Sequence, residues 1–522
     1  MFIGIDLGTT YCCVAYKNSI TNTLNVIDNP QKGGKSIPSV VSFSDDEIQY
    51  NLDAVNTKKN HPECVLYDAK RFIGRNFDNV NENFSLNKFN FTLINSNDKP
   101  AYCVKLKKKT LNLVPEQISG LILKYLKRIA EKIVDKVDGC VITVPAHFTT
   151  SEREATLFAA ELAGLKVLQL LNEPSAAAIS YGYEKSLQGN ILVFDFGGGT
   201  LDVSIVSIEN DSFDVVGYDG DQILGGRDID NLLLEFCTEV FQKTLGVGHD
   251  SPKKRAILLE KCELAKILLS EVNKTKTEIF DWNESNSIVL TKQKFDELCK
   301  PFFERSIKTV ERLLDNLKMK KTDIKEIIMT GGSSHIPLVQ DMIRVFFGKN
   351  PRCHDPEAAV AKGAAIVAFD FKKHDINLNL LDQIRYSIGI SINNLENKNG
   401  PTKFSIIAKA GTKIPCNITV DGFTTVEDNQ TKVDIQVAEG ESKYFKGNTF
   451  IDSFSLLDVP ARKAGDVMVE ITLHIDKSGI LLMSARETVN NTTKSKEMRR
   501  DGNFYKQNEK ENIKKAFVSI AH

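Results

Sequence analysis

The sequence predicts a mixed α/β region followed by a β-rich region. Up to about residue 375, short apolar runs typical of strands alternate with segments whose apolar residues recur at helical spacing. Such alternation favours a sheet covered by helices. After about residue 385, apolar and polar residues alternate with a period of two between turn signals, which is typical of an antiparallel β-sandwich.

The charge and composition exclude several classes of protein. The 67 Lys and Arg residues nearly balance the 68 Asp and Glu residues, so we expect no nucleic-acid partner. No uncharged apolar run approaches 18 residues, and Met1–Asp6 has neither a basic region nor a signal-type apolar stretch. We therefore expect no membrane association and a cytoplasmic location. The ten cysteines form no CxxC pair, which favours reduced, buried thiols.

The first region contains clear strand and helix signals. Phe2–Asp6, Gly139–Val144 and Asn190–Asp195 are apolar runs typical of buried strands. Pro115 opens a segment with helical apolar spacing, and Ser151–Glu154 has the pattern of a capping box, which predicts that a helix begins there.

The β-rich region and its flanks have their own patterns. Apolar and polar residues alternate over Val433–Val437 and Val469–Ile475. The leucine-rich Asn377–Asp382 is either the last helical turn of the first region or, as we favour, a linker that docks its apolar side chains. The polar tail from Lys494 is expected to be poorly ordered, with Asn508–Ala521 as its one possible helix.

Two segments, Ile3–Thr10 and Val193–Asp202, share one pattern. In each, a buried strand ends in an aspartate, Asp6 or Asp195, and a glycine turn with a hydroxyl residue follows. Glycine turns bring backbone N–H groups to a phosphate, and an aspartate beside phosphates can hold Mg²⁺, usually through water. The two copies predict two similar lobes with a nucleotide between them.

Other segments are weaker evidence of a nucleotide site when each is taken alone. The end of Gly34-Lys35-Ser36 fits a Walker A loop, but Asn29 replaces its first glycine, so we interpret it as a surface turn. Ile327–Pro337 is a third strand and glycine turn, which either approaches a nucleoside or is structural. Lys70 alone fits a surface lysine, and Glu173 is either a poised acid or a helix cap.

Together these residues resemble the heat-shock 70 kDa chaperones, which are built on the actin-like ATPase fold. The β-rich region from about Ser387 to Ala485 also resembles this family, so the likeness covers about nine tenths of the chain. Sugar kinases and actins share the phosphate motifs but lack the β-sandwich. The similar stretches are Gly4–Tyr11, Asp68–Arg75, Val144–Ala146, Asn172–Gly182, Phe194–Ser204, Leu224–Asn231, Gly331–Pro337 and Gly363–Ala365.

The resemblance implies a domain order. An actin-like, two-lobed ATPase domain would span 1–375, an interdomain linker 376–385, a β-sandwich peptide-binding domain 386–493, and a truncated, mostly disordered tail 494–522. The short tail predicts that most of the family's helical lid is missing.

The resemblance also implies roles for individual residues in Mg²⁺-dependent ATP hydrolysis. Asp6 and Asp195 would hold Mg²⁺ through waters, Glu173 would order that shell, and Lys70 would orient the attacking water; Thr200 completes the catalytic set. The implied nucleotide contacts are Gly8, Thr9, Thr10, Tyr11, Gly197, Gly198, Gly199, Thr200, Gly225, Gly226, Glu263, Lys266, Ser270, Gly331, Gly332, Ser333 and Glu357. The implied peptide groove consists of Ile390, Phe423, Val426, Val433 and Ile435.

The expected function is therefore an ATP-dependent chaperone that binds extended apolar polypeptide. The expected cofactors are ATP or ADP and Mg²⁺, with K⁺ as a further candidate. The expected partners are unfolded or nascent polypeptides, a J-domain co-chaperone and a nucleotide exchange factor. The alternative is a lid-less accessory chaperone that acts with a J-domain partner and cycles little ATP.

Several positions depart from the family pattern. Ile267 and His335 replace the two arginines that usually sandwich adenine, and Arg227 replaces an acid in the turn Leu-Gly-Gly-Glu-Asp. Asn379 replaces an apolar linker residue, and Asn393 replaces the methionine of the peptide arch. The resemblance thus implies weaker adenine binding and weaker coupling between ATPase and groove.

Overall fold

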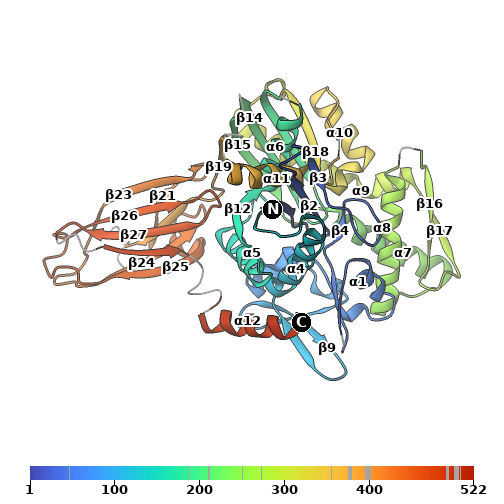
Figure 1. Ribbon diagram of the computed structural model, residues 1–522, viewed down its shortest axis with the longest axis horizontal. Coiled ribbons are helices and arrows are strands. Elements are labelled where there is room, and N and C mark those ends of the chain that lie inside the picture. Colours follow the sequence, from blue (N-terminus) through green and yellow to red (C-terminus); the bar gives the residue numbers. More distant parts are fainter. Residues whose placement is uncertain are drawn as a thin grey trace. The chain divides into compact units, whose positions relative to one another are not determined.

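A computed structural model gives the fold of the chain (Figure 1). It describes all residues except 46, 186, 210–211, 250, 272, 354, 374–378, 394–400, 490–492, 499–504, 506 and 522. The chain divides into two compact units, residues 1–147 and 156–380 with Ala521, and residues 148–155 with 381–520. The predicted domain limits at 375, 385 and 493 stay predictions.

The first unit contains two sheets with related topology. One has the order β12-β11-β1-β2-β3, with β4 also paired to β2, and the other contains the run β18-β13-β14-β15. In each, an antiparallel hairpin, β1-β2 or β13-β14, lies beside a parallel strand, β11 or β18. The bounds are β1 (Phe2–Asp6), β2 (Tyr11–Lys17), β3 (Leu24–Val26), β4 (Ile37–Pro38), β11 (Gly139–Val144), β12 (Val167–Asn172), β13 (Gly189–Phe196), β14 (Leu201–Glu209), β15 (Ser212–Asp221) and β18 (Glu326–Thr330).

Two helices pack against these sheets and against each other. Helix α11 (Ala359–Lys373) covers β1, β2 and β11, and α6 (Glu173–Lys185) covers β13 and β14. The contact is built from small residues, which lets the backbones approach closely. A Cβ atom on Gly363 would stand 1.8 Å from the Ala176 carbonyl oxygen, and one on Gly4 would stand 2.2 Å from the Ala365 nitrogen.

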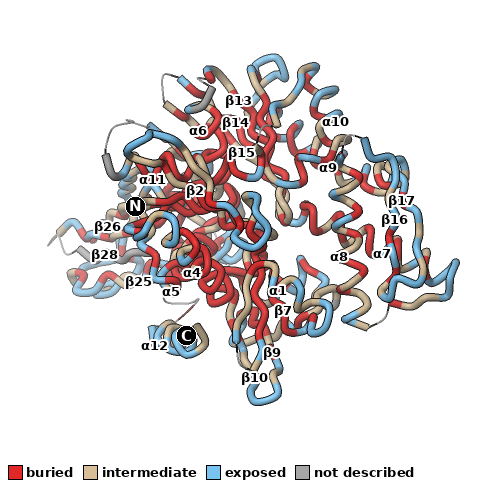
Figure 2. Tube along the Cα trace, turned by 45° about the vertical axis from the view of Figure 1, so that its right-hand side comes forward, coloured by how far each residue is buried: buried red, intermediate tan, exposed pale blue. Residues whose placement is uncertain are grey.

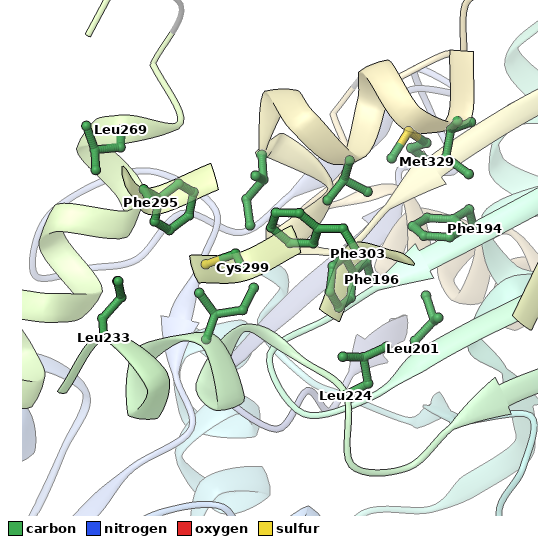
Figure 3. Packing of buried hydrophobic residues seen from close by; sticks show 14 of the residues in the cluster. Phe194, Phe196, Leu201, Leu224, Leu233, Leu269, Phe295, Cys299, Phe303 and Met329 are labelled. Atoms are coloured by element: carbon green, nitrogen blue, oxygen red, sulfur yellow. The ribbon is translucent and has the colours of Figure 1, made fainter. Parts of the chain in front are cut away.

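The larger apolar core of the unit lies under the second sheet. Strands β13 and β14 are almost wholly buried (Figure 2). Their inner side chains Phe194, Phe196 and Leu201 pack with Phe303 of the long helix α9 (Lys292–Asn316), as Figure 3 shows. Helices α7 (Gly226–Leu245), α8 (Pro252–Leu269) and α10 (Pro337–Phe347) complete this core.

Smaller elements complete the first unit. The strands are β5 (Val41–Phe43), β6 (Ile48–Tyr50), β7 (Val65–Leu66), β8 (Thr92–Asn95), β9 (Pro100–Lys105), β10 (Thr110–Leu113), β16 (Lys276–Phe280) and β17 (Ser287–Thr291). The α-helices are α1 (Asn51–Thr57), α2 (Ala69–Phe72), α3 (Phe77–Asn83) and α4 (Pro115–Val134), and the 3₁₀ turns are η1 (Pro62–Cys64), η2 (Leu86–Lys88), η3 (Lys321–Asp323) and η4 (Gly332–His335).

Helix α5 (Thr150–Leu162) begins one residue before the predicted capping box. The prediction that Ser151–Glu154 forms this box is wrong. The Glu152 carboxylate instead accepts a hydrogen bond of 2.8 Å from the Thr149 backbone N–H, and the Thr149 hydroxyl accepts one of 3.4 Å from the Glu152 N–H. Thr149 and Glu152 have the same spacing as the predicted pair, so the local pattern alone did not fix the start.

The second unit contains two four-stranded antiparallel sheets. Their orders are β21-β20-β24-β25 and β23-β26-β27-β28, and apolar side chains of both form one core. The two predicted alternating segments lie in β24 and β26, as expected. The bounds are β20 (Ile388–Ile392), β21 (Lys403–Ala408), β22 (Lys413–Ile414), β23 (Cys416–Thr424), β24 (Val433–Glu439), η5 (Phe445–Gly447), β25 (Thr449–Leu456), β26 (Met468–Ile475), β27 (Leu481–Glu487) and β28 (Thr493–Met498).

The leucine-rich segment is a strand where it is described. Strand β19 spans Asn379–Gln383, whereas Asn377 and Leu378 of the predicted linker lie outside the described residues. In the first unit, Asn379 donates a 3.1 Å hydrogen bond to the Ser212 hydroxyl, and Leu380 packs against the core around α6 and α11. The alternative prediction, a last helical turn of the first region, is therefore wrong for Asn379–Leu380.

The tail contains more regular structure than expected. Residues 493–498 form β28, which pairs with β27 from Leu481 to Arg486, and α12 spans Gln507–Ile520. Helix α12 agrees with the one helix expected in the tail, at Asn508–Ala521. The predicted disorder is wrong for β28, since strand pairing satisfies a backbone whose polar sequence gave no strand signal. All ten cysteines are unpaired, as expected. No helix within the described residues is both long and apolar enough to cross a membrane.

Candidate functional site

The first unit contains a cavity of about 660 Å³ at the ends of its two matching hairpins. Nearly all of the predicted nucleotide contacts line it. The lining residues from the prediction are Asp6, Gly8, Thr9, Thr10, Tyr11, Lys70, Glu173, Asp195, Gly197, Gly198, Gly199, Thr200, Gly226, Glu263, Lys266, Ser270, Gly331, Gly332, Ser333 and Glu357. Gly225 does not line the cavity; it packs behind the second turn, where a Cβ atom would stand 2.6 Å from the Gly198 carbonyl carbon.

The two glycine turns meet face to face. A Cβ atom on Gly198 would stand 2.1 Å from the Thr10 hydroxyl oxygen, and one on Gly199 would stand 2.7 Å from that of Thr9. Only glycine permits this approach at both positions. The turns between β1 and β2 and between β13 and β14 thus present backbone N–H groups and hydroxyls to the same end of the cavity, as a phosphate chain requires.

One lysine and several carboxylates gather at this end. Asp6 and Asp195 stand at the carboxyl ends of β1 and β13, and Glu173 opens α6 directly after β12. Lys70, on α2, forms an ion pair with Glu173, and the two side chains are 9% and 10% exposed. The interpretation of Lys70 as a surface lysine is therefore wrong.

Burial and mutual repulsion perturb these groups. Burial raises the pKa of Asp6, and burial together with the carboxylates of Glu173 and Asp202 raises the pKa of Asp195 well above its usual value. For Glu173, burial outweighs the attraction of Lys70 and raises the pKa to about 7. Burial alone would lower the pKa of Lys70, but the charges of Glu173 and Asp6 raise it. The cluster needs added positive charge to hold all its carboxylates ionised.

The opposite end of the cavity is held by hydrogen bonds from α7 and α8. Lys266 forms a 2.7 Å ion pair with Asp230 and donates a 3.1 Å hydrogen bond to the Gly226 carbonyl. The Tyr11 hydroxyl donates one of 3.3 Å to Glu263. The Ser333 hydroxyl donates one of 2.9 Å to the Gly197 carbonyl, which ties the third glycine turn to the second phosphate turn.

Ile267 and His335 also line the cavity, and each side chain is about half exposed. His335 lies 3.9 Å from the carboxylate of Glu357. Neither residue carries a guanidinium, so neither brings a planar cation to the cavity.

Arg227 is buried at the same end. Its guanidinium lies 3.6 Å from Glu263 and 3.8 Å from Asp68, and it stacks 5.4 Å above the Tyr67 ring. Burial opposes its charge, but Asp68 and Glu263 raise its pKa further above its usual value. The sequence marked this position only as a departure, although its place beside Gly225-Gly226 was a usable signal.

The turn Gly34-Lys35-Ser36 lies at the surface, as expected, and it also forms part of the cavity wall. Lys35 forms a 2.6 Å ion pair with Asp355, and the Ser36 hydroxyl donates a 2.6 Å hydrogen bond to Glu357. These partners are more than 300 residues away in sequence, so no local pattern reveals the contact.

The predicted groove residues of the second unit differ in exposure. Val426 is 50% exposed, and Phe423 and Val433 are half-buried at the edge of the sandwich core. Ile390 and Ile435 are buried in that core. The exposed and half-buried residues have apolar surface available to a ligand. Ile390 and Ile435 instead support the sheets from within the core.

Comparison with known proteins identifies the family. The family model described as "Hsp70 protein" matches residues 2–521. The heat shock 70 kDa proteins of Emericella nidulans and Neurospora crassa are each 37% identical over 93% of this chain, covering 76% and 75% of their own lengths. The heat shock cognate HSP70 protein of Trypanosoma brucei brucei is 36% identical over 94% of this chain and 74% of its own.

The matches extend over both the cavity-bearing unit and the β-rich unit, so they agree with the fold as a whole. They support the prediction of an ATP-dependent chaperone and give no support to the alternative, an accessory chaperone that cycles little ATP. The chain belongs to the Hsp70 family, whose members are ATPases, and it is an ATP-dependent molecular chaperone.

Proposed function

We propose that the cavity of the first unit is where this chaperone hydrolyses ATP to ADP and phosphate, and that Val426, Phe423 and Val433 contact extended apolar polypeptide. The observation that supports the hydrolytic site is the meeting of two glycine turns, Lys70 and three carboxylates at one end of the cavity. The single-turnover experiment on Lys70 below tests it.

The arrangement suits phosphoryl transfer to water, which needs positioning and charge neutralisation rather than a covalent nucleophile. Backbone N–H groups, that of Thr200 among them, and the hydroxyls of Thr9 and Thr10 hold the phosphate chain. Lys70, fixed by its ion pair with Glu173, orients the attacking water and stabilises negative charge on the γ-phosphate. At the other end, Glu263, Lys266 and Ser270 hold the adenosine.

Asp6 and Asp195 would hold Mg²⁺ through waters, and Glu173 would help to order those waters. Both carboxylates line the cavity, and their crowding calls for a cation. Within the described parts of the chain, no three His, Cys, Asp or Glu side chains are grouped as direct metal ligands. Two carboxylates with water between fit the usual habit of Mg²⁺, which supplies charge neutralisation when bound.

The remaining assignments follow from the family. A J-domain co-chaperone and a nucleotide exchange factor are proposed partners, and the cytoplasm is the proposed location. Unfolded polypeptide is the substrate class that the family binds in general.

Replacing Lys70 should separate binding from chemistry. Lys70→Ala removes the charge beside the γ-phosphate, and such stabilisation is worth about 2.7–4 kcal/mol, so hydrolysis should slow about 10²–10³-fold while ATP still binds. Single-turnover hydrolysis of prebound ATP measures this. Lys243→Ala, an exposed lysine on α7, serves as the control. Equal rates for Lys70→Ala and wild type would contradict the assignment.

Asp195→Asn should give a pH-dependent gain in stability without nucleotide. Because the folded-state pKa of Asp195 is raised above its unfolded value, the folded protein retains a proton that the unfolded chain loses, and wild-type stability falls as pH rises. The stability of Asp195→Asn does not fall in this way, because an asparagine side chain does not titrate. Its advantage in free energy of unfolding should widen as the pH rises above about 4, the usual pKa of an unfolded aspartate, by up to about 1.4 kcal/mol per pH unit.

Thermal or denaturant unfolding at several pH values measures this difference, with the exposed Asp421→Asn as control. With Mg²⁺ and ATP added, wild type should be more stable than Asp195→Asn, because the Asp195 carboxylate then helps to hold the cation. A difference that stays constant or narrows with pH would show that Asp195 is not held in an unfavourable charged environment.

Restoring arginine at the adenine end should tighten ATP binding. A guanidinium over an aromatic face contributes roughly 0.5–2 kcal/mol, so Ile267→Arg and His335→Arg should each lower the Kd for ATP about 2–30-fold. Titration with ATP and with GTP measures affinity and selectivity. Ile267→Lys adds charge without the planar group and is the control. If neither arginine tightens ATP binding, adenine is not held at this place.

Val426→Asp should weaken binding of an apolar heptapeptide. Full burial of a valine contributes about 1.5–3 kcal/mol, and Val426 has about half of its surface left to bury, so loss of this contact should raise the Kd about 4–12-fold. Fluorescence anisotropy of a labelled peptide measures it. Leu482→Asp changes another exposed apolar residue of the same unit, on β27. Similar losses in both variants would exclude a specific role for Val426.

A further inference from the structure

A buried histidine stands behind the phosphate end of the cavity, and the mechanism above does not use it. His147 follows β11 by three residues and is 1% exposed. Its Nδ1 atom lies 2.8 Å from Oδ1 of Asp202, which is 2% exposed. Asp202 is the second residue of β14, and it stands directly opposite Asp195 in the pairing of β13 with β14.

Asp202 connects this histidine to the cavity. Its carboxylate accepts hydrogen bonds from the Thr200 hydroxyl and from the Ala146 backbone N–H, in addition to the contact with His147. Thr200 lines the cavity, whereas His147 and Asp202 lie behind the lining. A continuous path of hydrogen bonds therefore runs from His147 through Asp202 to a hydroxyl at the phosphate end.

We propose that His147 is a positioning residue for ATP hydrolysis: it holds the Asp202 carboxylate, and Asp202 in turn fixes the hydroxyl of Thr200. The inference rests on the proposed assignment of the cavity as the hydrolytic site. Thr200 has a single hydroxyl proton and donates it to Asp202, so its lone pairs are directed elsewhere. At the lining they can accept a hydrogen bond from the attacking water and limit its orientations.

The charge of the cluster explains why a donor is needed behind Asp202. Four carboxylates, on Asp6, Glu173, Asp195 and Asp202, surround Lys70, and all but Asp6 are buried. A further N–H donor from His147 favours the charged carboxylate, which is the form that accepts from Thr200.

The test compares two substitutions of similar size. His147→Asn keeps an N–H near the position of Nδ1, and His147→Leu removes the donor but fills the space. Single-turnover hydrolysis of prebound ATP, the Kd for ATP and the unfolding temperature are measured for both. We expect His147→Leu to slow hydrolysis about 10–100-fold, the usual range for residues that orient a functional group. His147→Asn should stay within about threefold of wild type, and ATP affinity should be unchanged in both.

A purely structural role predicts another pattern. Rates for the asparagine and leucine variants that fall equally, or in proportion to their loss of unfolding temperature, would overturn the proposal, as would wild-type hydrolysis by His147→Leu. If the leucine variant does not fold, His147→Gln replaces it, because the glutamine amide falls near Nε2 and leaves Asp202 without the donor.

Two further variants separate this proposal from the assignment of the site. In a Thr200→Val background, His147→Leu should cause no additional loss, because its effect passes through the hydroxyl; an additive loss would overturn the path. Lys70→Ala is measured in parallel. If Lys70→Ala is slow and His147→Leu is normal, only the role of His147 fails. If Lys70→Ala hydrolyses like wild type, the site assignment itself fails.

Discussion

The close packing of α11 against β1 and α6 is the constraint on which the site depends. Gly4 and Gly363 leave no room for a side chain at either contact, so the backbones of strand and helices fix one another's positions. Because α6 begins with Glu173 and β1 ends with Asp6, this packing sets where two of the carboxylates stand. The second contact between glycine turns, at Gly198 and Gly199 against Thr10 and Thr9, then places Asp195 and Thr200 at the same end of the cavity.

This packing concentrates negative charge at one end of the cavity, and the repulsion between the carboxylates lowers the stability of the folded protein. Lys70 neutralises Glu173, but Asp6, Asp195 and Asp202 remain near one another with raised pKa values. Buried carboxylates destabilise an empty protein and become useful when a cation and a phosphate chain arrive. The carboxylate cluster thus lowers the stability of the protein without ligand. Bound nucleotide and metal, and not folding, neutralise its charge.

The sequence predicted the parts of the site that are local and missed those that are not. A strand ending in aspartate and followed by a glycine turn is a contiguous pattern, so both glycine turns that line the cavity could be predicted with their residues. Lys35, Ser36 and His147 could not be assigned, since their partners Asp355, Glu357 and Asp202 are supplied by tertiary packing. The β-sandwich was predictable from its period of two, but alternation does not distinguish a groove residue such as Val426 from a core residue such as Ile435. The polar strand β28 gave no signal at all, because its pairing with β27 determines it.

The departures at the adenosine end belong together. By the resemblance, Ile267 and His335 replace two cations that would face the base of the proposed nucleotide, while Arg227 adds a cation 3.6 Å from Glu263. A guanidinium so close to that carboxylate competes for the oxygens that would otherwise accept from the nucleoside, and its stacking on Tyr67 and its contact with Asp68 join α7 to the segment before α2. Positive charge has thus moved from the face of the base to a buried network beside it. Such a network joins parts of the protein to one another and not to the ligand, so in the proposed site nucleotide recognition depends more on the phosphate end.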